Sequence, residues 1–195
     1  MKTYIVKDTM EAFLESTNGE TYFLGLLTEA SVTRNISQES IKAGINSKVI
    51  GVVQNDDGME VSVTTGIYYK NFMEIPTGSK FANSAALAVQ DVTVDAEGLV
   101  TATEKTVTGD FLELTAGAFA KNCKLQLKTI AYDPDTNEVV ADIYWIFPKA
   151  TPSSNFEQAF GMGVNNVQTI GFTPQVDKAT DSYGQYIIAP RVIGE

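Results

Sequence analysis

The stretch CKLQLKTIAYDPDTNEVVADIYWIF, residues 123–147, decides the fold class of this chain. Apolar residues alternate with polar ones on both sides of DPDTNE, which is the pattern of two β-strands joined by a turn. Cys123 is predicted to be a small buried apolar residue in the first strand. The second strand is expected to be central or covered on both sides, because its outward face is also fairly apolar. Its predicted inward set is Val139, Ala141, Ile143, Trp145 and Phe147.

Further strand signals lie on either side of this stretch. The sequence DVTVDAEGLVTATEKTV, residues 91–107, predicts a hairpin that turns at residues 95–98. The runs SKVIGVVQ and GMEVSVTT flank NDDG at residues 55–58 and predict a second hairpin, because NDDG is a strong turn signal. Near the end of the chain, YGQYIIAP predicts a closing strand that ends at Pro190.

Helix signals are few and short. The segment PTGSKFANSAALAVQ, residues 76–90, offers Ser79 or Asn83 as a cap ahead of an alanine-rich turn or two. The segment TPSSNFEQAFGMG, residues 151–163, has Phe156 and Phe160 at helical spacing and ends at a glycine. DTMEAFLES, residues 8–16, is a third candidate. None of these segments is long enough to form a helical layer.

A long polar stretch does not fit the core pattern. It runs from Thr28 to Lys48 and is predicted to be a long polar loop. Connections of this length are uncommon in compact domains and often serve as interaction surfaces. An ordinary surface meander containing a short strand is the alternative. The candidate assembly residues in this stretch are Arg34, Glu39, Lys42 and Lys48.

Together these signals predict a mainly β protein. We expect an antiparallel β-sandwich or barrel with one or two short helices and a long polar loop. The 195 residues contain no fixed-period repeat and no low-complexity linker, so we expect a single β-rich domain over residues 1–195.

Composition argues against several classes of function. The 24 acidic and 14 basic residues give a net charge of −10, which disfavours tight binding to nucleic-acid phosphates. The chain has no histidine, so the commonest general base and metal ligand is missing, and its one cysteine allows no internal disulfide. In DPDTNE, a calcium loop would need glycine and glutamate where Glu138 and Tyr144 stand. We therefore predict no catalytic residue, no metal and no cofactor.

The sequence contains neither an export signal nor a membrane-spanning run. The N-terminal sequence has no continuous apolar core of signal-peptide length. No apolar run approaches the ~20 residues of a membrane-spanning helix. We expect a cytosolic origin and no membrane partner.

Two long segments resemble the tail-tube (major tail) proteins of tailed bacteriophages. They are SVTRNISQESIKAGINSKVIGVVQNDDGMEVSVTTGIYYKNFMEI, residues 31–75, and EVVADIYWIFPKATPSSNFEQAFGMGVNNVQTIGFTPQVD, residues 138–177. The resemblance lies in the arrangement of segments. A polar loop precedes paired strands, and later a strand ends in apolar residues followed by proline, before a loose helix or loop and a further strand. It extends diffusely over residues 31–177.

This resemblance implies a structural function without catalysis. Subunits of the family form rings, usually hexameric, that stack into a tube through which genome DNA passes without specific binding. The expected partners are other copies of the chain and other tail proteins. The expected location is the virion tail, assembled in the host cytoplasm. The polar loop with Arg34, Glu39, Lys42 and Lys48 would provide ring-to-ring contact.

Two alternatives remain open from the sequence. One is another β-fold virion component, such as a head-decoration or tail-terminator protein. The other is a monomeric binding module, because VTVDAEGLVTATEKT resembles an immunoglobulin-like repeat of surface proteins. An enzyme is the least favoured class, since no set of residues suggests a pocket with converging polar groups.

Overall fold

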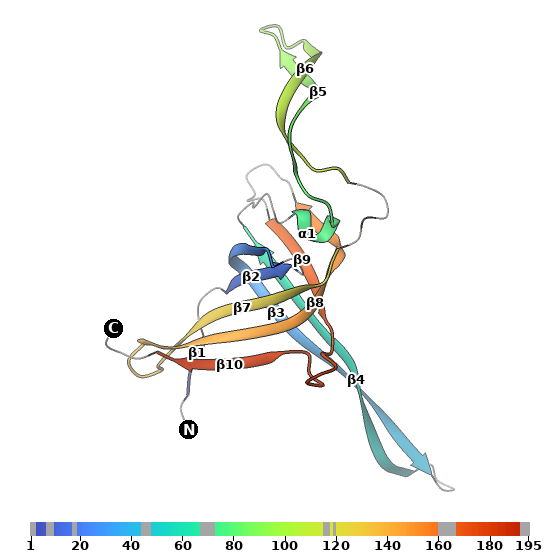
Figure 1. The fold of residues 1–195 in the computed structure, drawn as a ribbon, viewed down its shortest axis with the longest axis vertical. Helices are drawn as coiled ribbons and strands as arrows, with labels where there is room; N and C mark the ends of the chain where they lie inside the picture. Colours follow the sequence, from blue (N-terminus) through green and yellow to red (C-terminus); the bar gives the residue numbers. More distant parts are fainter. Residues whose placement is uncertain are drawn as a thin grey trace.

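The chain folds around a β-barrel from which two hairpins project (Figure 1). The computed structural model describes residues 3–6, 10–16, 19–43, 48–66, 73–114, 118, 120–159 and 167–191. These residues form ten strands and one helix, α1 (Glu74–Thr77). Every strand pairing is antiparallel. The predicted mainly β class is confirmed.

Six strands close the barrel. In order around it they are β7 (Cys123–Tyr132), β2 (Glu11–Ser16), β3 (Thr21–Ala43), β4 (Lys48–Thr65), β9 (Val167–Pro174) and β8 (Val139–Ala159). The ring closes because β7 pairs with β2 on one edge and with β8 on the other. Of the two predicted architectures, sandwich and barrel, the structure has the barrel. Within the closed ring each of the six strands pairs with a neighbour on both of its edges.

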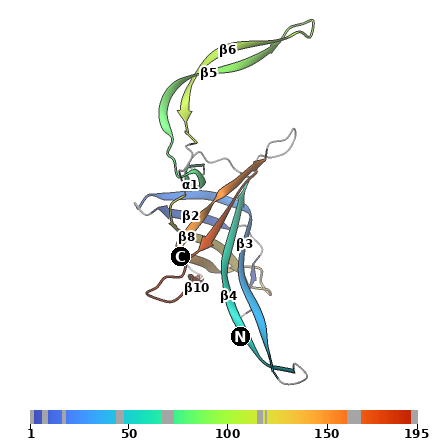
Figure 2. The ribbon, with the colours of Figure 1, turned by 90° about the vertical axis from the view of Figure 1, so that its right-hand side faces the viewer.

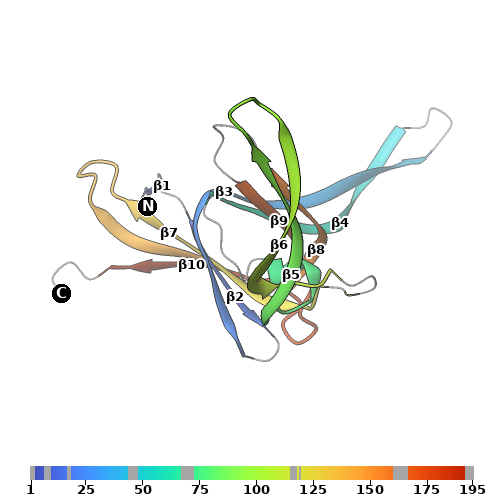
Figure 3. The same cartoon turned by 90° about the horizontal axis from the view of Figure 1, so that it is seen from above.

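Two short strands extend the sheet beyond the barrel. β1 (Ile5–Val6) pairs with the distal part of β7, and β10 (Gln185–Pro190) pairs with the first half of β8. The second half of β8 pairs with β9 on that same edge. The predicted closing strand that ends at Pro190 is therefore confirmed as β10. Seen from above, β1, β7 and β10 extend to one side of the barrel and the end of the β3–β4 hairpin to the other (Figure 3).

Alternating strands fill the barrel with apolar side chains. The predicted hairpin between β7 and β8 is confirmed, and the alternation of β7 is regular from Cys123 to Tyr132. Of the predicted inward set, Ala141, Ile143 and Phe147 are buried, and Val139 and Trp145 are half-buried. Cys123 is buried as predicted. The largest fully buried apolar side chains are Phe147, Phe172, Leu14, Leu24, Leu27, Leu125, Leu127, Ile170, Val61 and Val63.

Two hairpin arms extend from the barrel in different directions. The first is the distal part of β3 and β4, since β9 leaves β4 at Val61 and only β3 and β4 continue. The second is the separate two-stranded sheet of β5 (Ala82–Val94) and β6 (Val100–Phe111). Figures 1 and 2 show the two arms at opposite ends of the longest axis of the molecule.

The predicted helices are wrong over the described residues. Residues 82–90 of the alanine-rich segment belong to β5, whose partner strand β6 outweighs the helix preference of alanine. Residues 151–159 continue β8, and residues 160–163 lie outside the described part of the chain. Residues 11–16 form β2, paired on both edges. The single helix of the described residues, α1, lies before the predicted cap at Ser79.

The predicted loop from Thr28 to Lys48 is also wrong over the described residues, and residues 44–47 lie outside the described part of the chain. Residues 28–43 belong to β3, and Lys48 begins β4. Ala30 and Val32 pack against the core, but residues 36–42 are exposed and pair with β4 alone. Their side chains therefore show no hydrophobic alternation that would reveal the strand.

The predicted turn at residues 55–58 is a β-bulge. At this point Asn35 lies opposite Gly58 and Ile36 opposite Asp56, so Asp57 is the extra residue. Gly58 has a φ of 105°, a conformation that favours glycine, and its N–H donates to Asp56 Oδ1 at 3.1 Å. The NDDG signal therefore marks an irregular backbone without reversing the chain.

Candidate assembly surfaces

The four candidate residues lie on the β3–β4 arm. Arg34 is opposite Met59, Glu39 opposite Val53 and Lys42 near the end of the arm opposite Val49. The backbone of Lys48 pairs with that of Ala43. Because side chains alternate along β3, Arg34 and Lys42 are on one face of the ribbon and Glu39 is on the other. The structure thus brings the four onto one arm, spread along its length.

Arg34 has a defined partner at the base of the arm. Its Nη2 lies 2.7 Å from Asp56 Oδ2. This hydrogen bond lowers the pKa of Asp56, and the N–H of Gly58 acts in the same direction. Both side chains are substantially exposed, so the pair fixes the local geometry more than it stabilises the fold.

A cleft of about 510 Å³ lies beside this ion pair. Arg34, Asp56 and Met59 line it from the arm, Trp145 lines it from β8, and residues 181–186 close it on the side of β10. The ring of Trp145 is 4.7 Å from that of Tyr186 and 6.2 Å from that of Phe147, measured between centroids. The cleft is therefore an aromatic corner between the arm and the sheet extension.

The distal half of the β3–β4 arm exposes β-branched apolar residues. The exposed fractions of these side chains run from 42% to 55%. They are Ile36, Ile41, Val49, Val52 and Val53. Such a surface suits contact with another protein surface.

The β5–β6 arm is even more exposed. From Ala86 to Asp110 only Asp91 is partly buried. Its turn was predicted correctly at residues 95–98, where the side chain of Asp95 accepts hydrogen bonds from the N–H groups of Glu97 and Leu99. Gly98 adopts a φ of 82° in this turn. Lys105 Nζ lies 3.3 Å from Asp91 Oδ2 across the strands.

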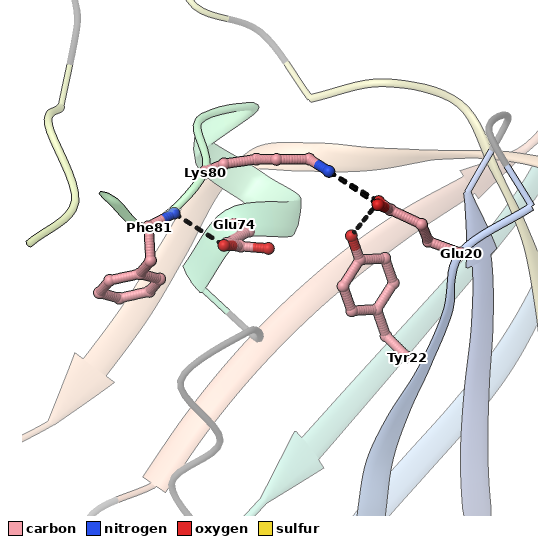
Figure 4. A network of polar contacts seen from close by, with 5 residues as sticks. All are labelled: Glu20, Tyr22, Glu74, Lys80 and Phe81. Carbon is pink, nitrogen blue, oxygen red and sulfur yellow. Dashed lines mark hydrogen bonds and ion pairs between the residues drawn. The ribbon is translucent and has the colours of Figure 1, made fainter. Parts of the chain in front are cut away.

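A polar network joins the base of this arm to the barrel (Figure 4). Lys80 Nζ contacts both carboxylate oxygens of Glu20, at 2.9 and 2.8 Å. Tyr22 donates its hydroxyl to the same carboxylate at 2.8 Å, and the N–H of Phe81 donates to Glu74 at 2.7 Å. The pKa of Glu20 is lowered, mainly by the hydrogen bond from Lys80. The pKa of Tyr22 is raised to about 12, mainly by desolvation.

Among the described residues, the sheet extension has an unpaired edge on each side. β10 pairs with β8, and β1 pairs with β7. β1 and β10 are the first and last strands in the order of the sheet. β10 exposes Tyr186, Ile187 and Ile188. Arg191, just after β10, forms a bidentate ion pair with Asp142, at 2.7 and 3.1 Å.

Two classes of feature are missing from the described part of the chain. It contains no group of three or more His, Cys, Asp or Glu side chains placed to hold a metal ion. None of its helices has the length and apolar character needed to cross a membrane.

Sequence reasoning identified one of these surfaces and missed the others. The β3–β4 arm was identified through its polar composition, although as a loop. For the β5–β6 arm the hairpin turn was found, but not its projection from the barrel. The alternation of Val92 and Val94 with polar residues indicated a strand but not its projection from the barrel. The Lys80–Glu20 pair spans 60 residues in sequence and has no local signal.

Two comparisons with known proteins bear on this arrangement. Residues 92–189 match the model of the YomU/Tube protein family, which is half of the chain. The chain is also 23% identical, over 240 aligned positions, to a tail tube protein of Bacillus phage SPR, an alignment that covers 98% of this chain and 90% of the relative. The resemblance to phage tail-tube proteins is thereby confirmed. The chain belongs to the YomU/Tube protein family and is a structural protein of the phage tail tube.

Proposed function

We propose that this chain polymerises with itself into rings, hexameric as in the family it resembles, and that the rings stack into a tube for passage of the genome. The observation that carries the proposal is the pair of exposed arms and the two sheet edges that no described strand of the same copy pairs with. Exposed strand edges and apolar ribbons are surfaces that proteins normally cover. In a polymer each copy covers those of its neighbours.

Ring closure would use the two sheet edges. A head-to-tail ring needs two different complementary surfaces on each subunit, and β1 and β10 are two such edges of one sheet. β1, β7, β8 and β10 alternate in direction, so β10 of one copy beside β1 of the next would continue the antiparallel order. Strand addition of this kind is a common mode of protein association.

Stacking would use the β3–β4 arm. It extends away from the barrel and carries Arg34, Glu39, Lys42 and Lys48, the residues that we propose as ring-to-ring contacts. Their mixed charges would set register between rings, since electrostatic complementarity contributes specificity more than affinity.

The remaining parts of the proposal follow from charge and family. The chain would act as a single domain and without catalysis. The net charge of −10 would let DNA slide past without specific binding. Other tail proteins would contact the two ends of the tube. The protein would reside in the virion tail after assembly in the host cytoplasm.

Negative-stain electron microscopy of the purified chain tests the proposal. We expect rings and stacked tubes at high protein concentration. A matched variant replaces residues 38–54 by Asn-Gly, which joins the paired residues Ser37 and Asn55 through a two-residue turn. This variant should keep the β-sheet circular dichroism and form rings without long tubes. Dispersed single copies of the wild-type chain at every concentration would refute the proposal.

A further inference from the structure

The β5–β6 arm has a surface that the barrel does not use. An isolated two-stranded hairpin is at best marginally stable in water, yet this one extends for 13 residues in β5, about 40 Å at ~3.3 Å per residue. Its apolar side chains are exposed by 38% to 65%. They are Leu87, Val89, Val92, Val94, Leu99, Val100 and Val107.

Both faces of this ribbon carry apolar residues. The register places Leu87 opposite Val107 on one face. On the other face Val92 lies opposite Ala102, and Val94 opposite Val100. A ribbon that is apolar on both faces is prone to aggregation unless a partner covers it.

Charge distinguishes the two arms. Residues 82–111 contain five acidic residues and one lysine. Residues 36–55, the distal half of the β3–β4 arm, contain Lys42, Lys48 and a single acidic residue, Glu39. In a chain with a net charge of −10, this half-arm is a net positive segment. The two arms are therefore complementary in charge.

The arms also point in suitable directions. They lie at opposite ends of the longest axis, so copies repeated along that axis bring the β5–β6 arm of one toward the β3–β4 arm of the next (Figures 1 and 2). The network of Glu20, Lys80 and Glu74 ties the base of the β5–β6 arm to the barrel and limits its direction. A contact between unlike ends repeats without closing, which is what a growing tube requires.

We propose that in the assembled tube the β5–β6 arm of one copy packs against the distal half of the β3–β4 arm of a copy in the adjacent ring. This inference rests on the proposed tube function and names both contact segments. Valines on the acidic arm would meet Ile36, Ile41 and the valines of the other arm, as in face-to-face packing of sheets. Glu97 and Glu104 would face the region of Lys42 and Lys48 at the margin of the contact.

A charge exchange between the arms tests this contact. One variant carries Lys42→Glu and Lys48→Glu, a second carries Glu97→Lys and Glu104→Lys, and a third carries all four changes. Tube length by negative stain at physiological salt is the measurement. We expect about tenfold shorter tubes in each of the first two variants and lengths within about threefold of wild type in the third, because like charges at a contact repel and the exchange restores attraction.

Matched controls carry the same change in net charge away from the arms. Lys149→Glu with Lys178→Glu, and Asp135→Lys with Glu138→Lys, alter exposed residues of β8, of the β9–β10 connection and of the β7–β8 turn. We expect tubes of wild-type length from both. The arm-to-arm contact would be overturned if tubes of the four-residue exchange were no longer than those of the shorter arm variant. It would also be overturned if tubes of the arm variants were as long as those of the controls. Neither outcome would contradict the tube itself. Absence of tubes from the wild-type chain would instead refute the proposed function.

Discussion

Replacing Gly184 by alanine should loosen β10 from the rest of the sheet. Gly184 immediately precedes β10, where Gln185 pairs with Ile146. A Cβ added at Gly184 would lie 2.4 Å from the carbonyl oxygen of Ile146 and 2.8 Å from Cδ1 of Phe147. Ordinary contacts are roughly 3.5 Å, so one of these groups must retreat by about 1 Å. The Ile146 carbonyl belongs to a paired strand and Phe147 is fully buried, which leaves β10 as the element that moves.

The expected loss in the free energy of unfolding follows from overpacking at this site. Inserting a methyl group into a filled site costs about 1–3 kcal/mol. With a urea m-value of about 2 kcal/mol/M, the midpoint of unfolding should fall by roughly 0.5–1.5 M. Such a loss is a large part of the ~5–15 kcal/mol that stabilises a typical domain.

The single tryptophan provides the assay. Trp145 contacts Tyr186 of β10, so its fluorescence reports on this strand, whereas far-ultraviolet circular dichroism reports on the whole sheet. In Gly184→Ala we expect the fluorescence transition to shift to lower urea, ahead of the circular dichroism transition. Gly109→Ala is the control, because an added Cβ there meets no atom within 4 Å. A Gly184→Ala midpoint within about 0.2 M of wild type would show that the space beside Ile146 is not closed.

Three further outcomes are expected. Both amide atoms of Gln168 are buried without a hydrogen-bond partner in the described structure. Gln168→Met should therefore raise the free energy of unfolding by about 1 kcal/mol. A decrease in the free energy of unfolding would indicate a bound water at the amide. Arg191 lowers the pKa of Asp142, so this pair stabilises the fold fully above pH ~4 and its contribution is lost as pH falls through the lowered pKa. Asp142→Asn should therefore destabilise more at pH 7 than at pH 2. Burial raises the pKa of Cys123 to about 12, so a thiol reagent at pH 8 should label it only after unfolding.

The β7–β8 hairpin of the barrel and the hairpin of the β5–β6 arm could be predicted from local pattern. The strict alternation in residues 123–132 and the turn at residues 95–98 predicted strands and a hairpin that the structure contains. For residues 123–132 the signal succeeds because one face of the strand meets a core and burial imposes a period of two, whereas for the β5–β6 hairpin it is the turn residues that succeed.

The remaining errors have a common physical cause. Alanine-rich residues 82–90 favour a helix in isolation, but the pairing with β6 decides their conformation. Residues 36–42 of β3 are exposed and do not face the core, so this part of the strand has no hydrophobic period. Local pattern could not predict three features, because each depends on contacts between residues distant in sequence. They are the closure of the barrel, the Lys80–Glu20 ion pair and the pairing of one edge of β8 with both β10 and β9.

The continuity of β8 has a mechanical consequence. This one strand runs for 21 residues from the sheet extension into the barrel wall, pairing with β7 on one edge and with β10 and then β9 on the other. Tension applied along it is shared by many backbone hydrogen bonds at once, because these bonds lie perpendicular to the strand. The subunit therefore resists stretching along this direction far better than peeling of β10 from its edge, and rupture under load should begin at β10 while the barrel remains closed.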